Sequence, residues 1–356
     1  MHDLKELINK LERDHMLSRQ EFIALIDGRT PELAEYLFEK ARCIRHKVFG
    51  RDVYIRGLIE FTNYCKNDCC YCGIRRSNQL AERYRLSPEE ILDCCRRGYE
   101  LGFRTFVLQG GEDGWYLQVK DSGVSIITDL IRRIKSEFPD CALTLSFGEH
   151  DRAAYLEWFE AGADRYLLRH ETACDDHYRK LHPPELSLTR RKECLRSLKE
   201  IGYQTGSGFM VGSPGQTTEC LAEDLLFLYE LQPHMIGIGP FVPHKDTPFA
   251  EEPGGTAELT LFLLGILRLM FPGALLPATT ALGTIDPNGR EKGILSGANV
   301  VMPNLSPANV REKYALYNNK LSSGSEAAEA LNELNQRLCS IGYRIRIDRG
   351  DAPTLL

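Results

Sequence analysis

The sequence has no long uninterrupted hydrophobic run, although 43% of its 356 residues are hydrophobic. No segment stays apolar for the roughly 20 residues that a membrane-spanning helix needs. The first residues, 1–16, are charged and lack the apolar core of a signal peptide. These absences predict a cytoplasmic protein with no membrane partner.

Excess positive charge is also absent, since 44 Lys and Arg residues are outnumbered by 50 Asp and Glu residues, for a formal net charge of -6. Proteins that bind nucleic acid usually present a basic surface to the phosphate backbone. We therefore expect no nucleic-acid partner.

Cysteine is too sparse for a disulfide scaffold, with 12 residues in the chain, and a reducing compartment favours free thiols and metal thiolates. Several of the cysteines are expected to be small packing residues. Three others have a distinctive spacing, C-x3-C-x2-C, directly after an apolar segment, and no fourth cysteine follows at a partner spacing. They are Cys65, Cys69 and Cys72.

Three closely spaced cysteines without a fourth favour an iron–sulfur cluster with one open iron. In a four-iron cubane each iron takes a ligand besides the sulfides, so three thiolates leave one iron free to bind a substrate or cofactor. A structural zinc site would need a fourth ligand, and the nearest downstream histidine is His150. Cys70 is expected to point away, because adjacent residues cannot easily face one cluster.

Strand-like and helix-like segments alternate along most of the chain. Helices are expected over 3–15 and 31–48, and further helices begin at Ser87, Asp151 and Ser187, which are good N-cap residues. The expected strands are 53–62, 105–111, 142–148, 165–171, 203–212, 235–243, 275–282 and 299–303.

Eight strands that alternate with helices predict an α/β fold, a parallel (β/α)8 barrel of the TIM type. An open doubly wound sheet is the rival, but it rarely contains eight such units in unbroken order. We divide the chain into an N-terminal helical extension over 1–50, the barrel over 51–320 and a C-terminal helical cap over 321–356. A helix is expected near 325–341 in the cap.

The cysteine motif has an aromatic residue, Tyr71, before its last cysteine, and it follows the first expected barrel strand. This arrangement resembles the radical S-adenosylmethionine (SAM) superfamily. The resemblance implies a [4Fe-4S] cluster on Cys65, Cys69 and Cys72, whose open iron binds SAM. It further implies that the reduced cluster cleaves SAM to a 5'-deoxyadenosyl radical, while the protein orients the cofactor and excludes water and oxygen.

One further segment lies where members of this superfamily hold the methionine amino group of SAM. Gly110, Gly111, Glu112 and Asp113 close the second expected strand. Small residues let the backbone approach a ligand, and carboxylates can accept an ammonium group. An ordinary glycine-rich turn with solvated acids is the alternative.

Three other positions are expected at SAM by the same resemblance. Glu171, at the end of the fourth expected strand, is assigned to the ribose hydroxyls, and Ile238 on the sixth strand to adenine. Arg190, at the start of a helix, can pair with the SAM carboxylate, although the adjacent Arg191 is an alternative and a surface ion pair would also explain it.

Longer strings resemble one family within the superfamily, the radical SAM maturases of [FeFe]-hydrogenase called HydE. The resemblance covers nearly the whole chain, and the family is similar in fold to biotin synthase and methylornithine synthase. The strings are RYLLRHETA (165–173), MVGSPGQT (210–217), GIGPFVPHKDTP (237–248), PATTALGTI (277–285) and GANVVMPN (297–304).

Membership would imply a role in assembly of the hydrogenase H-cluster. The implied substrate is a small iron–carbonyl–cyanide–cysteine complex, with adenosyl attack at a sulfur of that complex. The implied partners are two companion maturases, a second radical SAM enzyme and a GTPase scaffold, and an electron donor such as ferredoxin or flavodoxin. An inner pocket with cationic and hydroxyl groups would suit cyanide and carboxylate. Its expected residues are Arg165, Thr279, Thr280, Met302, Arg311 and Tyr314.

The C-terminal region departs from some members of that family. Those members carry further cysteines that bind an auxiliary cluster, whereas residues 305–338 contain none and Cys339 stands alone. We therefore expect a single cluster. A methylornithine-synthase-like or biotin-synthase-like enzyme is the alternative within the same superfamily, and a non-catalytic scaffold that carries a preformed cluster is the alternative from another class.

Overall fold

The computed structural model describes residues 3–119, 123–322 and 327–353. Its helices are α1 (Leu4–Asp14), α2 (Arg19–Asp27), α3 (Pro31–Phe49), α4 (Pro88–Glu100), α5 (Ile126–Glu137), α6 (Arg152–Glu160), α7 (Asp175–Leu181), α8 (Leu188–Ile201), α9 (Thr218–Leu231), α10 (Ala257–Met270), α11 (Thr280–Ile285), α12 (Gly289–Leu295), α13 (Ala308–Arg311) and α14 (Leu331–Ser340), with short 3-10 turns at Gly114–Leu117 and Ala328–Ala330. Its strands are β1 (Asp52–Ile55), β2 (Gly57–Thr62), β3 (Thr105–Gly110), β4 (Ala142–Ser146), β5 (Arg165–Leu167), β6 (Gln204–Ser207), β7 (Met210–Val211), β8 (Met235–Ile236), β9 (Gly239–Pro240), β10 (Val300–Val301) and β11 (Arg344–Arg346).

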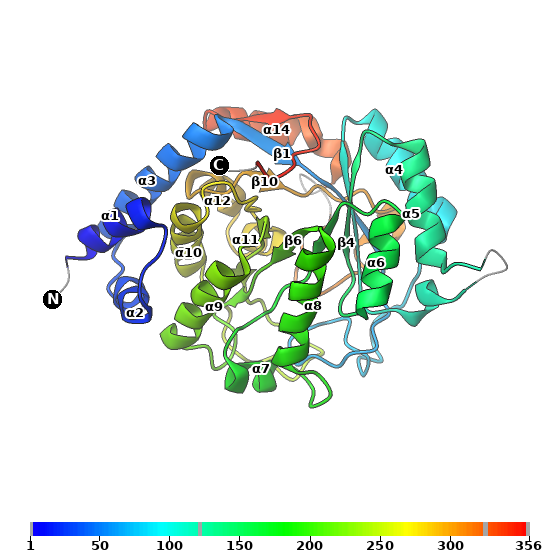
Figure 1. Ribbon diagram of the computed structural model, residues 1–356, viewed down its shortest axis with the longest axis horizontal. Coiled ribbons are helices and arrows are strands. Elements are labelled where there is room, and N and C mark those ends of the chain that lie inside the picture. Colours follow the sequence, from blue (N-terminus) through cyan, green and yellow to red (C-terminus); the bar gives the residue numbers. More distant parts are fainter. Residues whose placement is uncertain (1–2, 120–122, 323–326, 354–356) are drawn as a thin grey trace.

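The parallel strands close into a ring, which Figure 1 shows from the side. Six of them hydrogen-bond in the order β2-β3-β4-β5-β6-β8. The ring then continues through the bridges Met235–Leu275 and Pro277–Val300, and β10 pairs with β1. The predicted (β/α)8 barrel is therefore confirmed, and the open doubly wound sheet is excluded because no edge separates the last strand from the first.

Local capping signals placed several helices correctly. Thr30 caps α3 with Pro31 in its first turn, and Ser87 forms a capping box with Glu90 at the start of α4. Helix α2 was missed because it is only nine residues long and its apolar pattern is weak.

Most strands are shorter than the apolar segments that predicted them. The segments 203–212 and 235–243 each contain two short strands, because Gly208, at φ +151°, faces Gly237 and a Cβ there would lie 2.0 Å from its carbonyl oxygen. Segment 165–171 is a strand only as far as Leu167. Segment 275–282 forms only isolated bridges at Leu275 and Pro277 before α11 begins at Thr280.

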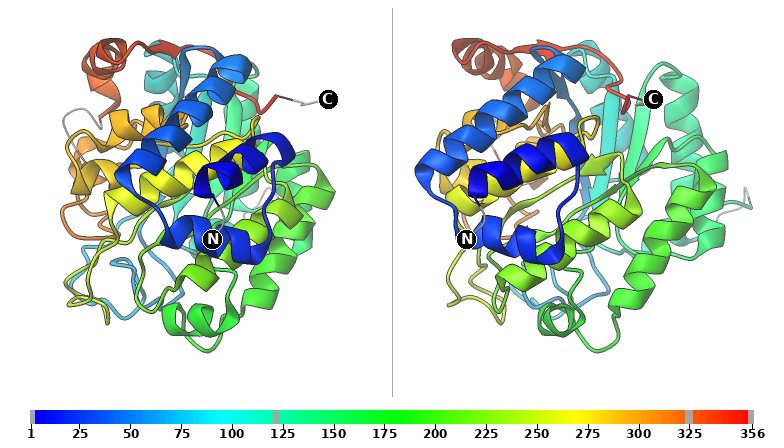
Figure 2. Two further views of the ribbon diagram at one scale, coloured as in Figure 1. Left: turned by 90° about the vertical axis from the view of Figure 1, so that its left-hand side faces the viewer. Right: turned by 60° about the vertical axis from the view of Figure 1, so that its left-hand side comes forward.

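The N-terminal helices cover one flank of the barrel (Figure 2). Helices α1 and α3 pack on α10, and α2 packs on α9. Because α10 lies between these helices and the strands, its residues 260–270 are all buried and it is apolar on every side. Among the described residues, every helix is too short or too polar to cross a bilayer.

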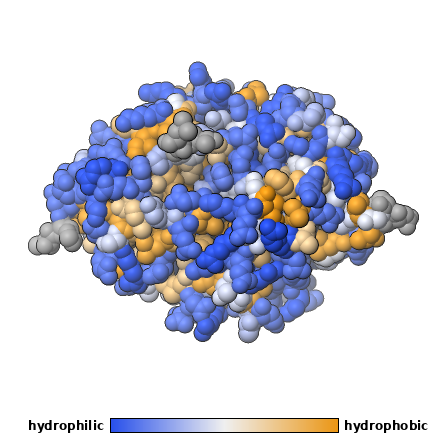
Figure 3. All heavy atoms as spheres, viewed as in Figure 1, coloured by the Kyte–Doolittle hydropathy of each residue, from blue (hydrophilic) through white to orange (hydrophobic). Residues whose placement is uncertain are grey.

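The two ends of the barrel have different roles (Figure 1). The C-terminal segment lies at the amino ends of the strands, where β11 pairs with β1. The loop that carries the cysteine motif lies at the carboxyl ends, beside α7. Residues 1–2, 323–326 and 354–356 of the expected extension and cap lie outside the described residues. The division into three domains stays a prediction. Polar side chains cover most of the face in Figure 3, and hydrophobic ones form small separate patches.

Candidate active site

The three-cysteine motif lies in a long loop, residues 63–86, between β2 and α4, and we call this segment the cluster loop. It contains no regular strand or helix, so side chains must hold its shape. One guanidinium does most of this, since Arg83 donates four hydrogen bonds of 2.5 to 3.1 Å to carbonyl oxygens of the loop, those of Asn63, Ile74, Arg75 and Asn78.

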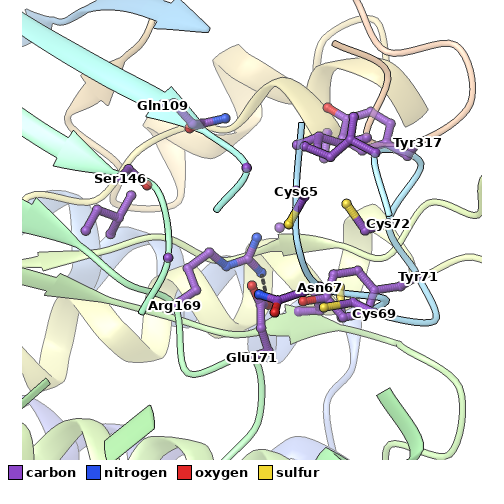
Figure 4. A pocket seen from close by; sticks show the side chains of 18 of the residues that line it. Cys65, Asn67, Cys69, Tyr71, Cys72, Gln109, Ser146, Arg169, Glu171 and Tyr317 are labelled. Atoms are coloured by element: carbon purple, nitrogen blue, oxygen red, sulfur yellow. Dashed lines mark ion pairs between the residues drawn. The ribbon is translucent and has the colours of Figure 1, made fainter. Parts of the chain in front are cut away.

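The motif cysteines and Tyr71 line one cavity of about 300 Å³ at the carboxyl ends of the strands (Figure 4). Cys70 does not line it, and its backbone N–H donates to the carbonyl oxygen of Leu181 at 2.9 Å. Burial raises the pKa of all three motif thiols, to about 12 for Cys72. Because iron binds thiolates, loading this site releases protons.

Two glycines of the cavity wall allow close approach of neighbouring segments. A Cβ on Gly111 would lie 2.2 Å from the carbonyl oxygen of Tyr64 and 2.7 Å from the Cβ of Cys65. Gly148, at φ +93°, is equally close to the Glu112 side chain. No larger residue fits either position without moving the loop or the carboxylate.

We expect Gly111→Ala to lower iron incorporation well below that of the unmodified protein, because the methyl group must push the first cysteine away, at a cost of about 1–3 kcal/mol. Iron per chain after anaerobic reconstitution is the measurement. Gly114→Ala is the matched control, since a Cβ there meets no heavy atom within 4 Å. Equal iron contents in the two variants would contradict the close approach.

The two acidic residues after β3 have different surroundings. Glu112 lines the cavity, where its carboxylate lies 2.9 Å from Lys66 Nζ and accepts the backbone N–H of Glu149 at 2.9 Å. Asp113 lies away from the cavity and is held by Thr62 and Arg85 at 2.8 and 2.5 Å. The structure thus brings Glu112 to the predicted site, whereas Asp113 anchors the turn.

Glu171 faces the cavity from a strained backbone position. Its φ is +64°, in the left-handed region that few non-glycine residues adopt. The carboxylate lies 3.2 Å from Nη2 of Arg169, which also lines the cavity, and Figure 4 shows the pair directed toward the cysteines.

A buried polar network anchors that turn. His170 lies 2.9 Å from Ser207 Oγ and 3.3 Å from Asp224 Oδ1, and Asp224 also accepts the backbone N–H of Ala173. The three side chains resemble a nucleophilic triad in type, but all are fully buried outside the cavity. They therefore fix the backbone on both sides of Glu171.

The two adjacent arginines of α8 are separated by the helix rotation. Arg191 lines the cavity with an 8% exposed side chain, pairs with Glu149 and donates to the carbonyl oxygen of Arg169 at 2.7 Å. Arg190, the expected carboxylate partner, is 44% exposed and pairs with Asp151 at 2.8 Å on the surface. The structure thus brings Arg191, the alternative, to the cavity and leaves Arg190 on the surface.

The inner wall of the cavity contains hydroxyl and amide groups. Tyr314 and Thr279, both expected there, line it together with Gln109 and Ser146. Thr279 Oγ1 is buried and has no hydrogen-bond partner among the described residues. Ile238 belongs to the apolar core, and its neighbours Gly239 and Pro240 form the wall instead.

Four residues expected in the inner pocket lie elsewhere. Arg165 begins β5 at the opposite end of the barrel and pairs with Asp351 at 2.5 Å. Arg311 pairs with Glu329, Met302 packs in an apolar cluster with Phe49 and Met235, and Thr280 begins α11. Arg165 misses the cavity because a side chain on a barrel strand reaches the mouth only from the carboxyl end.

The same rule could have found the residues that were missed. Gln109 is the last but one residue of β3, Ser146 is the last residue of β4, and Arg169 follows β5 by two residues. Tyr317 gives no such signal, because it comes from the loop after α13. Only the folded chain brings that loop over the barrel mouth.

The thiol arrangement fits a cluster better than a single ion. No group of three or more His, Cys, Asp or Glu side chains in the described part of the chain converges to hold one metal ion. Thiolates that bind separate irons of a cubane need not converge on one point. Three thiols on one wall, with a carboxylate, an arginine and an unpartnered hydroxyl opposite, suit a three-cysteine cluster and an adjacent charged ligand.

A parallel barrel with a three-cysteine loop and a polar cavity at the carboxyl ends of its strands is the arrangement of a radical SAM enzyme. Residues 59–228 match the model of the Radical SAM superfamily. The chain is 46% identical over 317 residues to the [FeFe] hydrogenase maturase subunit HydE of Thermotoga maritima, which spans 89% of this chain and 88% of that protein. The chain belongs to the HydE family of radical SAM enzymes.

One further relative and two solved structures are also similar to this chain. The 3-methylornithine synthase of Methanosarcina acetivorans is 32% identical over 90% of this chain and 88% of its own. A crystal structure of methylornithine synthase (PylB) matches with a TM-score of 0.80 at 27% identity, over 96% of this chain and 97% of that one. The maturase HydG matches with a TM-score of 0.81 at 21% identity, over 97% of this chain and 76% of that one, which shows the shared fold alone.

Proposed function

We propose that the chain is a hydrogenase maturase that acts on a small iron–carbonyl–cyanide–cysteine complex during assembly of the [FeFe]-hydrogenase H-cluster. The observation that carries this proposal is the cavity, which joins the cluster loop to an inner wall of neutral and cationic donors. The 46% identity to HydE over nearly the whole chain supports the same conclusion.

In this proposal Cys65, Cys69 and Cys72 hold one [4Fe-4S] cluster, which when bound supplies the electron that cleaves SAM to a 5'-deoxyadenosyl radical. The chain's own side chains bind and orient SAM. Glu112 binds the amino group of SAM, and Gly110 and Gly111 let the backbone come close to it. Arg191 binds the carboxylate of SAM.

The other end of SAM meets a second group of side chains. Glu171 takes the ribose hydroxyls, and the glycine-rich wall at Gly239 accommodates adenine, with Tyr71 completing the pocket beside the cysteines. SAM bound in this cavity would displace water from the barrel mouth, which protects a reactive radical.

The substrate end of the cavity favours an anionic ligand. Its donors are Arg169 and the hydroxyls of Thr279 and Tyr314, and the unpartnered Thr279 Oγ1 can donate to a cyanide nitrogen or a carboxylate oxygen. The two acids among the described residues that line the cavity, Glu112 and Glu171, are both used by SAM in this proposal. No further carboxylate of those lining residues is left for the ammonium group of a substrate.

Methylornithine synthase chemistry is the second candidate, because the 32% identity and the TM-score of 0.80 indicate a closely related barrel. A lysine-derived substrate needs acidic partners in the cavity. The donor-rich inner wall weighs against it, as does the lower identity.

We propose that the chain holds a single cluster, because Cys339 is exposed on α14 and residues 305–338 contain no cysteine. A companion radical SAM maturase would supply the substrate and a GTPase scaffold would receive the product. A ferredoxin or flavodoxin would supply the electron.

The test uses anaerobically reconstituted protein, dithionite and SAM. We expect 5'-deoxyadenosine from slow cleavage without substrate, and faster SAM consumption with an adenosylated product when a synthetic iron–carbonyl–cyanide–cysteine complex is added. Lysine is the matched comparison and should change neither the rate of SAM consumption nor the products. Stimulation by lysine alone would favour the methylornithine synthase candidate, and an intact cluster that never cleaves SAM would favour a non-catalytic scaffold.

A further inference from the structure

The hydroxyl of Tyr71 reaches out of the cluster loop to helix α7. It lies 3.2 Å from Nε2 of His182, and the two rings meet edge to face with centroids 5.5 Å apart. One residue earlier, the backbone N–H of Cys70 donates to the carbonyl oxygen of Leu181 at 2.9 Å. The end of α7 therefore holds two consecutive residues of the loop between the second and third motif cysteines.

His182 is itself fixed in orientation. Its ring stacks on Tyr178 with centroids 3.9 Å apart and planes at 22°, and Nδ1 lies 3.0 Å from the carbonyl oxygen of Tyr178. A carbonyl oxygen only accepts, so Nδ1 carries the proton and Nε2 of the neutral ring is an acceptor. Burial lowers the pKa of His182 to about 3, which keeps the ring neutral. Tyr71 O–H consequently donates to His182.

This hydrogen bond determines where the Tyr71 ring stands. The ring packs on an apolar cluster of Leu181, Met210 and Phe241, a surface that leaves its direction loosely defined. The cluster loop supplies no strand or helix to restrain it. A directional bond to a fixed acceptor selects the orientation in which the ring forms the cavity wall beside Cys69 and Cys72.

We propose that His182 is a positioning residue for SAM binding, acting through Tyr71. It lies outside the cavity and does not touch the cofactor. It holds the Tyr71 ring in place beforehand, so that no side-chain conformational freedom has to be lost there when SAM binds. The proposal rests on the proposed use of this cavity for SAM.

The test is a double-mutant cycle in the reconstituted protein. The variants are His182→Leu, which removes the acceptor, Tyr71→Phe, which removes the donor, and their combination, with the SAM dissociation constant measured by anaerobic equilibrium dialysis. We expect each single change to raise the SAM dissociation constant about three- to tenfold, as for one lost hydrogen bond. The double change should raise the constant no more than either single change does. His182→Gln, whose amide oxygen can accept from Tyr71, should restore most of the affinity.

His177→Leu is the matched control. His177 is also a buried histidine of α7, and it bonds a hydroxyl, Ser213 Oγ at 3.2 Å, that lies away from the cavity. Its loss should lower the melting temperature as much as His182→Leu without changing SAM affinity. The ring nitrogen shifts of ¹⁵N-histidine-labelled protein without cluster should also report a neutral, Nδ1-protonated His182.

Several outcomes would overturn the proposal. These are an unchanged dissociation constant in His182→Leu, multiplying effects of the two single changes, an equal loss of affinity in His177→Leu, or an Nε2-protonated ring. If His182→Leu does not fold, His182→Gln and Tyr71→Phe still decide, since equal affinity in Tyr71→Phe and the unmodified protein contradicts the role. Unmodified protein that binds no SAM would overturn the proposed function as well, whereas the other results concern His182 alone.

Discussion

Replacing Cys69 with alanine should give a folded protein that retains almost no iron and cleaves SAM only at background level. Two thiolates hold a [4Fe-4S] cluster much more weakly than three thiolates do, and without the cluster no electron reaches SAM. Because Cys69 lies in a loop outside the barrel, we expect the free energy of unfolding of the protein without cluster to change by no more than about 1 kcal/mol. Iron and sulfide content and the yield of 5'-deoxyadenosine are the measurements.

Cys70→Ala is the control that the chain itself offers. Cys70 is adjacent in sequence and similar in exposure, but it faces away from the cavity and bonds to α7 only through its backbone. Iron content and SAM cleavage should both stay near those of the unmodified protein. If Cys70→Ala loses iron while Cys69→Ala keeps it, the ligand assignment is wrong.

The second large effect is expected at Arg191. Arg191→Leu leaves Glu149 buried without a partner, which should cost about 3–5 kcal/mol of stability and abolish SAM binding. Arg191→Lys keeps the positive charge but loses the two-pronged donor geometry. We expect it to fold and to raise the SAM dissociation constant by roughly ten- to a hundredfold, since a charge-assisted hydrogen bond is lost.

Arg190 supplies the comparison one residue away. Its guanidinium is exposed and pairs with an exposed aspartate, so Arg190→Leu should change stability by less than about 1 kcal/mol and leave SAM affinity unaltered. Equilibrium dialysis of SAM against both variants, with melting curves, separates binding from folding. Weaker binding in Arg190→Leu than in Arg191→Lys would return the carboxylate to Arg190.

The sequence predicted the barrel well because its signals are local. Apolar segments separated by capped helices predicted eight strands in order, and Ser87 and Thr30 cap helices as expected. What local signals could not supply was the length of each strand. The interruption at Gly208 depends on its contact with Gly237, which is 29 positions later and meets it only in the folded sheet.

The site was predicted unevenly for a related reason. The three cysteines and Tyr71 are close in sequence, so one loop brings them to one cavity. Arg165 and Arg169 are only four residues apart, yet an extended chain separates them by roughly 13 Å, the difference between the bottom of the barrel and its mouth. Only Arg169 lines the cavity, whereas Arg165 is bonded to the C-terminal segment.

The sequence by itself determined the class of this protein, its alternation of strands and helices, and the three thiols on which its chemistry depends, because each is set by residues close together along the chain. The tertiary structure decided which neighbour of each pair faces inward, Arg191 rather than Arg190 and Glu112 rather than Asp113. It also placed His182 under Tyr71. The physical reason is that helix rotation, strand length and long-range packing direct a side chain, and none of these is fixed by the residue's immediate neighbours.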